Sequence, residues 1–152
     1  MRVILQRVSS ASVSVGTEEV ASIGAGFLAL VGIAVGDGPE DVDTAVSKIR
    51  GLRVFPDDEG RMNLGIADVG GSVLVVSQFT LYAEMARGRR PSFTGAAEPS
   101  LAEPLIKRMI EGLRSSGVPT ESGVFGAKMN VALVNDGPVT LVLDVRQGRV
   151  SS

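Results

Sequence analysis

The stretch GFLALVGIAV, residues 26–35, decides the fold class, because it is almost continuously apolar over the length of a strand. Such a run is typical of a central strand that is covered on both faces. Before it, residues 11–15 (ASVSV) alternate between apolar and hydroxyl side chains, which predicts a half-buried strand. After it, the sequence GDGP at residues 36–39 interrupts the chain. These segments predict a sheet with a buried centre.

Two segments have the apolar spacing of helices. Residues 40–50 place apolar side chains at i, i+3, i+4 and i+7, and their charges, acidic at the start and basic at the end, match the helix dipole. The second helix is predicted to begin at Ser100, which forms a capping box with Glu103, and Pro104 removes one backbone hydrogen bond near this start. The residues expected to be buried are Val42, Ala45, Val46 and Ile49 in the first helix, and Leu101, Leu105, Met109 and Leu113 in the second.

Further strands are predicted from short apolar runs between turn signals. They cover residues 52–55, 72–81, 129–135 and 139–145, the last two joined by Asp136-Gly137-Pro138. About seven strands and two helices indicate an α+β fold, with mainly antiparallel β-sheets packed with two helices. We expect one domain over residues 1–145 and a frayed C-terminal tail over 146–152.

The composition excludes several kinds of chemistry. The 152 residues include no cysteine and no histidine, so thiolate nucleophiles, disulfides, cysteine-bound zinc and a histidine base are absent. The start is too short and too soon polar for a signal peptide, and no apolar run approaches a membrane span, so a cytoplasmic protein without a membrane partner is expected. The net charge of −2 and 4% aromatic content argue against DNA as a partner.

The segment SQFT, residues 77–80, puts polar side chains at the end of an apolar strand. They either satisfy local backbone groups or line a site. A nucleophilic Thr80 needs a group to take its proton, and only carboxylates, lysines, Tyr82 or the substrate remain for that. This restriction favours reaction at an already activated bond, assisted by backbone N–H donors or by the substrate.

The segment NDGPVT, residues 135–140, has two interpretations. Asp-Gly is a strong signal for a hairpin turn, but Pro138 stands where a ladder N–H would resume. Alternatively, a cis Gly137-Pro138 bond holds two successive carbonyl groups in a fixed arrangement for recognition.

Three other features admit a bland and a functional interpretation. Arg87, Arg89 and Arg90 form either a solvated loop or a phosphate contact. Arg7 is either an ordinary edge residue or a buried brace for a loop. Around Gly126, Phe125 and Met129 are either core residues or the walls of a flat nucleobase pocket.

Four of these segments together resemble the D-aminoacyl-tRNA deacylase family, also called D-tyrosyl-tRNA deacylase. They are residues 1–15 (MRVILQRVSSASVSV), 77–83 (SQFTLYA), 88–93 (GRRPSF) and 134–144 (VNDGPVTLVLD). The resemblance runs from Met1 to about Asp144 and implies a homodimer with its sites at the subunit interface, without metal or cofactor. It implies hydrolysis of the ester between a D-amino acid and the 3′-terminal adenosine of tRNA, with glycyl-tRNA as a further substrate.

The resemblance also implies roles for single residues. Ser77, Gln78, Phe79 and Thr80 would line the scissile ester, with Thr80 positioning groups and the ribose 2′-hydroxyl assisting the reaction. Gly137 and Pro138 would project from one subunit into the site of the other and read the stereocentre with their carbonyl groups, braced by Arg7. Phe125, Gly126 and Met129 would hold the adenine, and the loop with Arg87, Arg89 and Arg90 would contact the tRNA.

Some positions depart from the family pattern. The segment EMARGRRPSF (84–93) lacks the polar or charged lead that relatives more often carry, Lys128 stands where an acidic residue is common, and the chain continues past Asp144. Two alternatives of other classes stay open. One is a non-catalytic module that binds a small D-amino acid or nucleotide, which turnover would distinguish. The other is a DNA-binding protein, which the charge disfavours.

Overall fold

The chain forms one large curled sheet with two helices on one face, and the structure, a computed structural model, describes residues 1–151. The sheet has seven strands, in the order β7-β6-β3-β1-β8-β9, with β2 paired to β1, and a separate pair is formed by β4 and β5. The elements are β1 (Arg2–Val15), β2 (Glu18–Ile23), β3 (Gly26–Gly32), α1 (Pro39–Gly51), β4 (Phe55–Pro56), β5 (Met62–Leu64), β6 (Ser72–Ser77), the 3-10 turn η1 (Phe79–Tyr82), α2 (Pro99–Ser115), β7 (Thr120–Ser122), β8 (Asn130–Arg146) and β9 (Arg149–Val150).

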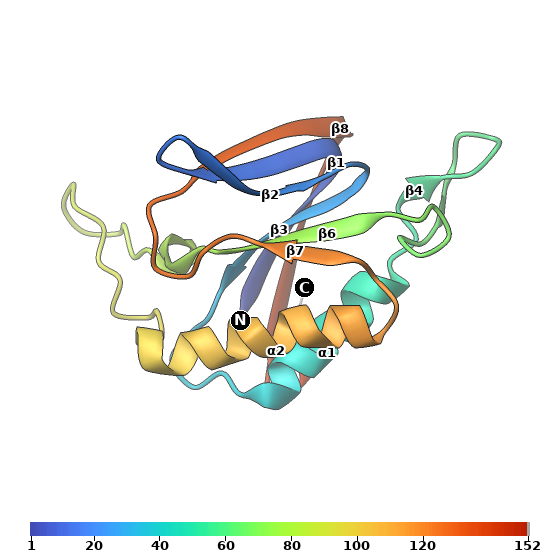
Figure 1. The fold of residues 1–152 in the computed structure, drawn as a ribbon. Helices are drawn as coiled ribbons and strands as arrows, with labels where there is room; N and C mark the ends of the chain where they lie inside the picture. Colours follow the sequence, from blue (N-terminus) through green and yellow to red (C-terminus); the bar gives the residue numbers. More distant parts are fainter. Residues whose placement is uncertain (152) are drawn as a thin grey trace.

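The predicted α+β class is confirmed. Five strand pairs are antiparallel, and two, β3–β6 and β6–β7, are parallel. In Figure 1 α1 and α2 lie together under the sheet, while β1, β2 and β8 curl over its other face. No helix in residues 1–151 combines the length and apolarity that crossing a membrane requires.

The central position of β3 is confirmed by two cores that share its side chains. Phe27, Ala29 and Val31 point toward the helices, and Leu28 points into a second core under β2. Neighbouring β6 divides its side chains between the two cores in the same alternating way. Burial on both faces explains why the run at residues 26–32 lacks polar side chains.

Strand β1 changes from the first core to the second where it passes Arg7. On one side of Arg7 lies Gln6, paired with Thr140, and on the other lies Val8, paired with Asn135. One residue of β1 therefore faces the four residues 136–139 of β8, which are extruded from the ladder as a bulge. The residues of β1 before Arg7 that enter the first core are Val3 and Leu5, next to Met1, and those after Arg7 in the second core are Val8, Ala11 and Val13.

The expectation of two strands joined by a turn at 136–138 is therefore wrong. β8 is one strand whose two halves both pair antiparallel with β1, so the chain does not reverse there. The Asp-Gly pair serves a bulge rather than a hairpin, because β1 is long enough to pair with both halves.

The start of the second helix also differs from expectation. α2 begins at Pro99 with Glu98 as its N-cap and no side-chain cap bond, so the capping box of Ser100 and Glu103 is not formed. Leu101 is 63% exposed instead of buried. The reason is that Pro99, whose fixed backbone angle suits the first helical position, starts the helix before Ser100 and places that serine inside the first turn. The buried face consists of Ala102, Leu105, Ile106, Met109 and Leu113.

Two further boundaries are corrected. The strand predicted for 72–81 ends at Ser77, and residues 79–82 form η1. In the predicted strand 52–55 only Phe55 is part of β4. The tail is not frayed over residues 146–151, because β9 pairs with β8 and the Ser151 N–H donates to the Asp144 carbonyl at 2.8 Å. Ser152 lies outside the described residues.

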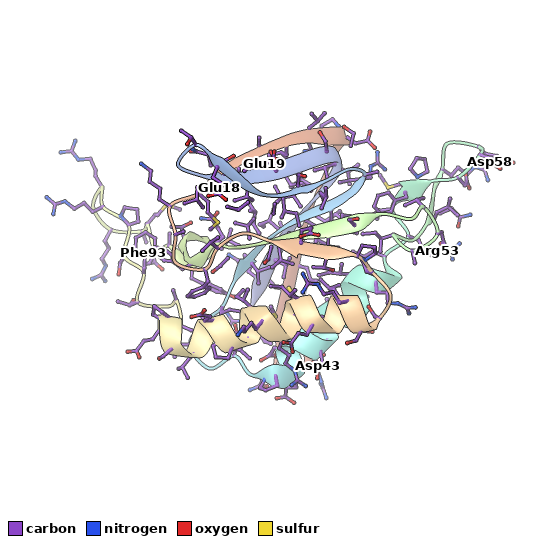
Figure 2. All side chains as sticks on the ribbon, in the orientation of Figure 1. Glu18, Glu19, Asp43, Arg53, Asp58 and Phe93 are labelled. Carbon is purple, nitrogen blue, oxygen red and sulfur yellow. The ribbon has the colours of Figure 1, made fainter. Side chains whose placement is uncertain are left out.

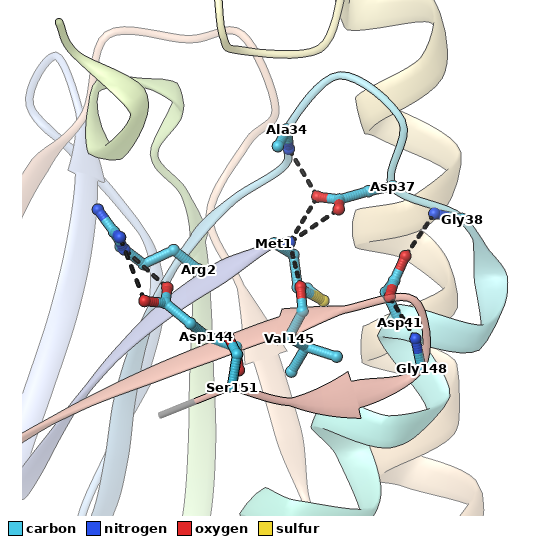
Figure 3. A network of polar contacts seen from close by, with 10 residues as sticks. All are labelled: Met1, Arg2, Ala34, Asp37, Gly38, Asp41, Asp144, Val145, Gly148 and Ser151. Atoms are coloured by element: carbon cyan, nitrogen blue, oxygen red, sulfur yellow. Dashed lines mark hydrogen bonds and ion pairs between the residues drawn. The ribbon is translucent and has the colours of Figure 1, made fainter.

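Polar contacts attach this end of the chain to α1 (Figure 3). Asp41 in the first turn of α1 accepts a hydrogen bond from the Gly148 N–H at 2.8 Å, and the Thr44 hydroxyl donates to the Gly148 carbonyl at 2.9 Å. Arg2 donates to both carboxylate oxygens of Asp144, at 2.7 and 3.2 Å. These hydrogen bonds, followed by the positive charge of Arg2, lower the pKa of Asp144 against the opposing effect of burial.

Candidate active site

A cavity of about 560 Å³ opens beyond the carboxyl end of β6. Three segments that are distant in the sequence form most of its walls: residues 76–79 at the end of β6 and after it, residues 93–102 before and within α2, and residues 125–131 before and within β8. The structure thus gathers Ser77, Gln78, Phe79, Phe125, Gly126 and Met129 around one space.

The turn η1 forms because β6 leaves its ladder at Gln78. The Gln78 N–H donates to the Val31 carbonyl at 2.8 Å, and the Gln78 carbonyl accepts the Leu81 N–H at 3.2 Å. Gly32 lies beneath this turn: a Cβ there would lie 3.0 Å from Leu81 Cβ and 3.1 Å from the Gln78 carbonyl oxygen. The absence of a side chain at Gly32 lets the turn pack directly on β3.

Thr80 does not line the cavity, although its neighbours do. Its hydroxyl oxygen accepts a hydrogen bond from the Gln78 side-chain amide. An amide donor cannot take a proton from the hydroxyl, so this contact orients Thr80 without activating it. Within residues 1–151, the backbone N–H groups of Phe79 and Thr80 have no hydrogen-bond acceptor, as is normal for the first groups of a helical turn.

The opposite wall depends on a close contact between Gly123 and Met129. A Cβ at Gly123 would lie 2.5 Å from the Met129 sulfur, so a larger residue there would displace the end of the Met129 side chain. The Gly123 N–H donates to the Val75 carbonyl at 3.0 Å, which ties the segment to β6. Gly126 has a φ of 77°, a conformation that favours glycine, and turns the chain between Phe125 and Met129. This wall of the cavity therefore consists of an aromatic ring, a thioether side chain and glycine backbone.

The cavity contains few groups that ionise. Among the described residues, Glu98 is the only ionisable side chain that lines it. Tyr82, a possible proton acceptor on the sequence alone, lies outside the lining. Burial, reinforced by the negative charge of Asp37, raises the pKa of Tyr82 to about 12. At neutral pH Tyr82 keeps its proton and cannot act as a base.

The bulge at 136–139 is held at its base by Arg7, which is buried. Arg7 donates through Nε to the Asp136 carbonyl at 3.1 Å and through Nη1 to the Val54 carbonyl at 2.6 Å. The Asp136 carboxylate lies 3.3 Å from Nε. Gly137 and Pro138, joined by a cis peptide bond, are exposed and do not line the cavity of their own chain. The loop is thus exposed and forms no part of the cavity of the chain that carries it.

Side-chain contacts that the sequence did not reveal close the same bulge. The Asn135 amide donates to Gln6 at 2.8 Å and to the Thr140 hydroxyl at 3.1 Å, and its carbonyl oxygen accepts the Val139 N–H at 3.2 Å. The available sequence signal for these contacts is the pair of residues at the two ends of NDGPVT, an amide and a hydroxyl that flank the residues of the bulge. Gln6 gives no signal of its own.

Phe93 and Glu98 are two cavity residues that sequence reasoning missed. They belong to residues 88–99, whose Gly and Pro content indicates only a loop. A recognisable signal is Gly95-Ala96-Ala97 beside Phe93, since small residues next to an aromatic ring leave room for a ligand. Arg87, Arg89 and Arg90 lie before Phe93 on an exposed loop and do not line the cavity.

Known proteins share this fold and these segments. The family model described as D-Tyr-tRNA(Tyr) deacylase matches residues 4–144. The D-aminoacyl-tRNA deacylase of Thermomicrobium roseum is 56% identical over 100% of this chain and 99% of its own length. That of Chloroflexus aurantiacus is 53% identical over 99% of this chain and 94% of its own. A solved structure of the c-Myc DNA Unwinding Element Binding Protein, 39% identical, covers 95% of this chain and 98% of its own, with a TM-score of 0.89.

The family model spans nearly the whole chain, and both of these deacylases are more than half identical to it. The chain belongs to the D-aminoacyl-tRNA deacylase family, a family of hydrolases.

Proposed function

We propose that this chain hydrolyses the ester bond between a D-amino acid and the 3′-terminal adenosine of tRNA, and that it also accepts glycyl-tRNA. The observation that carries the proposal is the cavity itself. The SQF segment, 77–79, forms one wall, and Phe125, Gly126 and Met129 form a flat wall suited to a nucleobase. Two relatives that match almost the full chain carry the name of this activity.

The active form is a homodimer in this proposal, and Gly137-Pro138 of each subunit enters the cavity of the other. Two observations support it. The bulge is exposed and leaves its own cavity without a selectivity element. The strand that carries it also exposes apolar side chains on both sides of the bulge, with Val134 56% and Val142 53% exposed. A second copy would cover such a face.

Selectivity for D-amino acids then depends on main-chain atoms. The carbonyl groups of residues 137 and 138 accept hydrogen bonds from the α-amino group of the aminoacyl ester, which fixes the direction of the side chain. A D side chain points to solvent, an L side chain meets the loop, and glycine has no side chain to exclude. The amino acid's identity matters little, because its side chain contacts no specific pocket.

The reaction proceeds by addition of water to the ester carbonyl carbon, after which the bond to the ribose 3′-oxygen breaks and that oxygen takes the proton. The free N–H groups at Phe79 and Thr80 stabilise the negative oxygen, and the Thr80 side chain, which lies outside the cavity wall, helps to position the water through its hydrogen bond with the Gln78 side chain. The neighbouring 2′-hydroxyl of the ribose assists the water, since neither Thr80 nor Tyr82 meets a base. An aminoacyl ester is labile, so positioning supplies most of the rate.

The first test measures release of labelled tyrosine from D-Tyr-tRNA and L-Tyr-tRNA side by side, with EDTA present. Rapid loss of the D ester alone supports the proposal, and equal rates or no release refute it. A second substrate carries a 2′-deoxy terminal adenosine, which should slow hydrolysis by about two orders of magnitude or more. Glu98→Gln separates the remaining alternative: a comparable loss in this variant would make Glu98 the base.

The solved relative that is named for a DNA element raises a second class of partner. A single-stranded DNA oligonucleotide added to the same assay measures it. Inhibition at concentrations similar to those of deacylated tRNA would put DNA among the ligands of the cavity.

A further inference from the structure

The loop before Phe93 carries positive charge that the rest of the molecule does not use. The backbone groups of Glu84 and Ser92 pair at 2.7 and 2.9 Å and close a loop of residues 85–91, the arginine loop. At the base of this loop the Glu84 carboxylate is already engaged, because it accepts a hydrogen bond from the Ala86 N–H at 2.9 Å. In the part of the chain that the structure describes, Arg87, Arg89 and Arg90 take part in no hydrogen bond or ion pair.

Two aromatic rings connect this loop to the cavity. Phe79 and Phe93 pack edge to face, with ring centroids 5.1 Å apart and an interplanar angle of 72°. Both line the cavity, yet they are 55% and 36% exposed. Phe93 directly follows Ser92, which closes the loop, and Figure 2 shows it between the loop and the body of the molecule. Cavity, aromatic rim and positive charge are therefore contiguous.

This arrangement suits single-stranded RNA. Bases stack on exposed aromatic rings while phosphates bind arginines. A free nucleoside would occupy the cavity alone and leave the loop unused. The charge is local, because the whole chain carries −2. Glu98, on the same cavity, repels phosphate and so directs the nucleic-acid backbone toward the loop.

We propose that Phe79, Phe93 and the arginine loop form a second subsite, which binds the nucleotides immediately before the terminal adenosine. The penultimate base stacks on Phe93, and the phosphates on its 5′ side contact Arg87, Arg89 and Arg90. The inference rests on the proposed function, because it takes the terminal adenosine to lie in the cavity. It makes a single-stranded 3′ end, rather than an aminoacyl nucleoside, the unit of recognition.

The test compares three esters of D-tyrosine: with adenosine, with the trinucleotide CCA, and with full tRNA. For the wild-type chain we expect kcat/KM to rise at least about 30-fold from adenosine to CCA. Arg89→Gln combined with Arg90→Gln should lower kcat/KM at least tenfold on CCA and tRNA and leave the adenosine ester unchanged. The slope of log kcat/KM against log salt should fall by about 1.4, or about 0.7 for each single-strand phosphate that is left without its arginine.

Phe93→Leu tests the stacking part: because Phe93 also lines the cavity, the adenosine ester should lose some activity, and the loss on CCA should exceed that loss by about tenfold. The matched control is Arg146→Gln combined with Arg149→Gln. It removes the same charge from the β8–β9 end and should change none of the three rates. An arginine effect that is absent on CCA, or equal on adenosine and CCA, overturns the subsite. A wild-type chain that releases tyrosine from none of the esters refutes the proposed function instead.

Discussion

Arginines in two regions of this molecule are used in opposite ways. Arg2 and Arg7 are held by the fold: Arg2 by Asp144 and the face of the Tyr82 ring, at 5.7 Å from its centroid, and Arg7 by two backbone carbonyls. Arg89 and Arg90 extend from a loop and, within the described residues, contact no acceptor. Side chains of one type thus stabilise the chain where acceptors surround them, and remain available for a ligand where none do.

Experiments can test this difference between the two groups of arginines. We call Arg2, Arg7 and the residues that contact them the paired region, and substitutions there should lower the free energy of unfolding. Substitutions around the cavity and the arginine loop should change activity and preserve stability.

The largest effect is expected from Gly137→Ala, next to Arg7. A Cβ at this position would lie 2.8 Å from Val139 Cγ2, 3.0 Å from the Val139 backbone nitrogen and 3.1 Å from an Arg7 nitrogen, and φ is 129°. Overpacking and an unfavourable backbone conformation should together cost about 3 kcal/mol in urea unfolding. Gly36→Ala is the control, since its φ is also positive, at 93°, but no atom lies within 4 Å of the added carbon. Equal losses in both variants would show that the contacts around residue 137 do not matter.

Arg7→Lys should have the next largest effect and lower the free energy of unfolding by about 2 kcal/mol. An ammonium group lacks the planar fork that reaches the Val54 and Asp136 carbonyls together. One of these two partly buried hydrogen bonds is then lost. Arg61→Lys removes an exposed fork that is 3.4 Å from Glu59 and should cost under about 0.5 kcal/mol. Chemical denaturation of the two variants decides this prediction, which fails if their losses coincide.

A smaller effect is expected from Asp144→Asn, about 1 kcal/mol at pH 7. Because Arg2 lowers the pKa of Asp144 in the folded chain, its contribution is fully present above the ordinary carboxyl pKa and is lost as the pH falls through the folded value. The gap between wild type and variant should therefore shrink below about pH 4. Unfolding curves at pH 7 and pH 3 measure it, and a gap that stays constant would contradict the ion pair's role.

The smallest effect on stability is expected from Thr80→Ala, within about 0.5 kcal/mol, because its hydroxyl is exposed and contacts only Gln78. Deacylation of D-Tyr-tRNA should fall less than about tenfold if Thr80 positions groups. A rate near that of the uncatalysed reaction would instead make Thr80 the nucleophile, and a loss of stability would place it in the paired region.

Local patterns predict those parts of the fold and site that depend on near neighbours. The apolar run at residues 26–35 predicts a central strand, which the structure has as β3 ending at Gly32, with Val35 exposed. The helical spacing predicts the inner face of α1, where Val42, Ala45 and Ile49 are buried and Val46 is partly buried. The SQFT segment stands out because hydroxyl and amide groups interrupt an apolar strand. The lack of histidine and cysteine, a property of the composition alone, limits the chemistry that any site in this chain can use.

Where local and long-range signals disagree, the local interpretation fails. Asp136-Gly137 is a good turn sequence, but β1 pairs with the chain on both sides of it, so a bulge braced by Arg7 replaces the turn. Ser100 and Glu103 match a capping box, but Pro99 starts the helix earlier. The sequence after Asp144 predicts a loose tail, but in the structure Asp41 of α1 accepts a hydrogen bond from the Gly148 N–H and so holds this segment.

The sequence by itself determined the central strand, the first helix, the absence of histidine and cysteine chemistry, and the segments that resemble a family. Only the tertiary structure decided that parts of the segments 76–79, 93–102 and 125–131 share one cavity with Ile33, that Thr80 lies outside its wall, and that Gly137 and Pro138 are exposed and lie outside it too. The physical reason is that secondary structure follows from periodic burial along the chain, whereas a site depends on strand register, which is set by pairing between residues far apart in sequence.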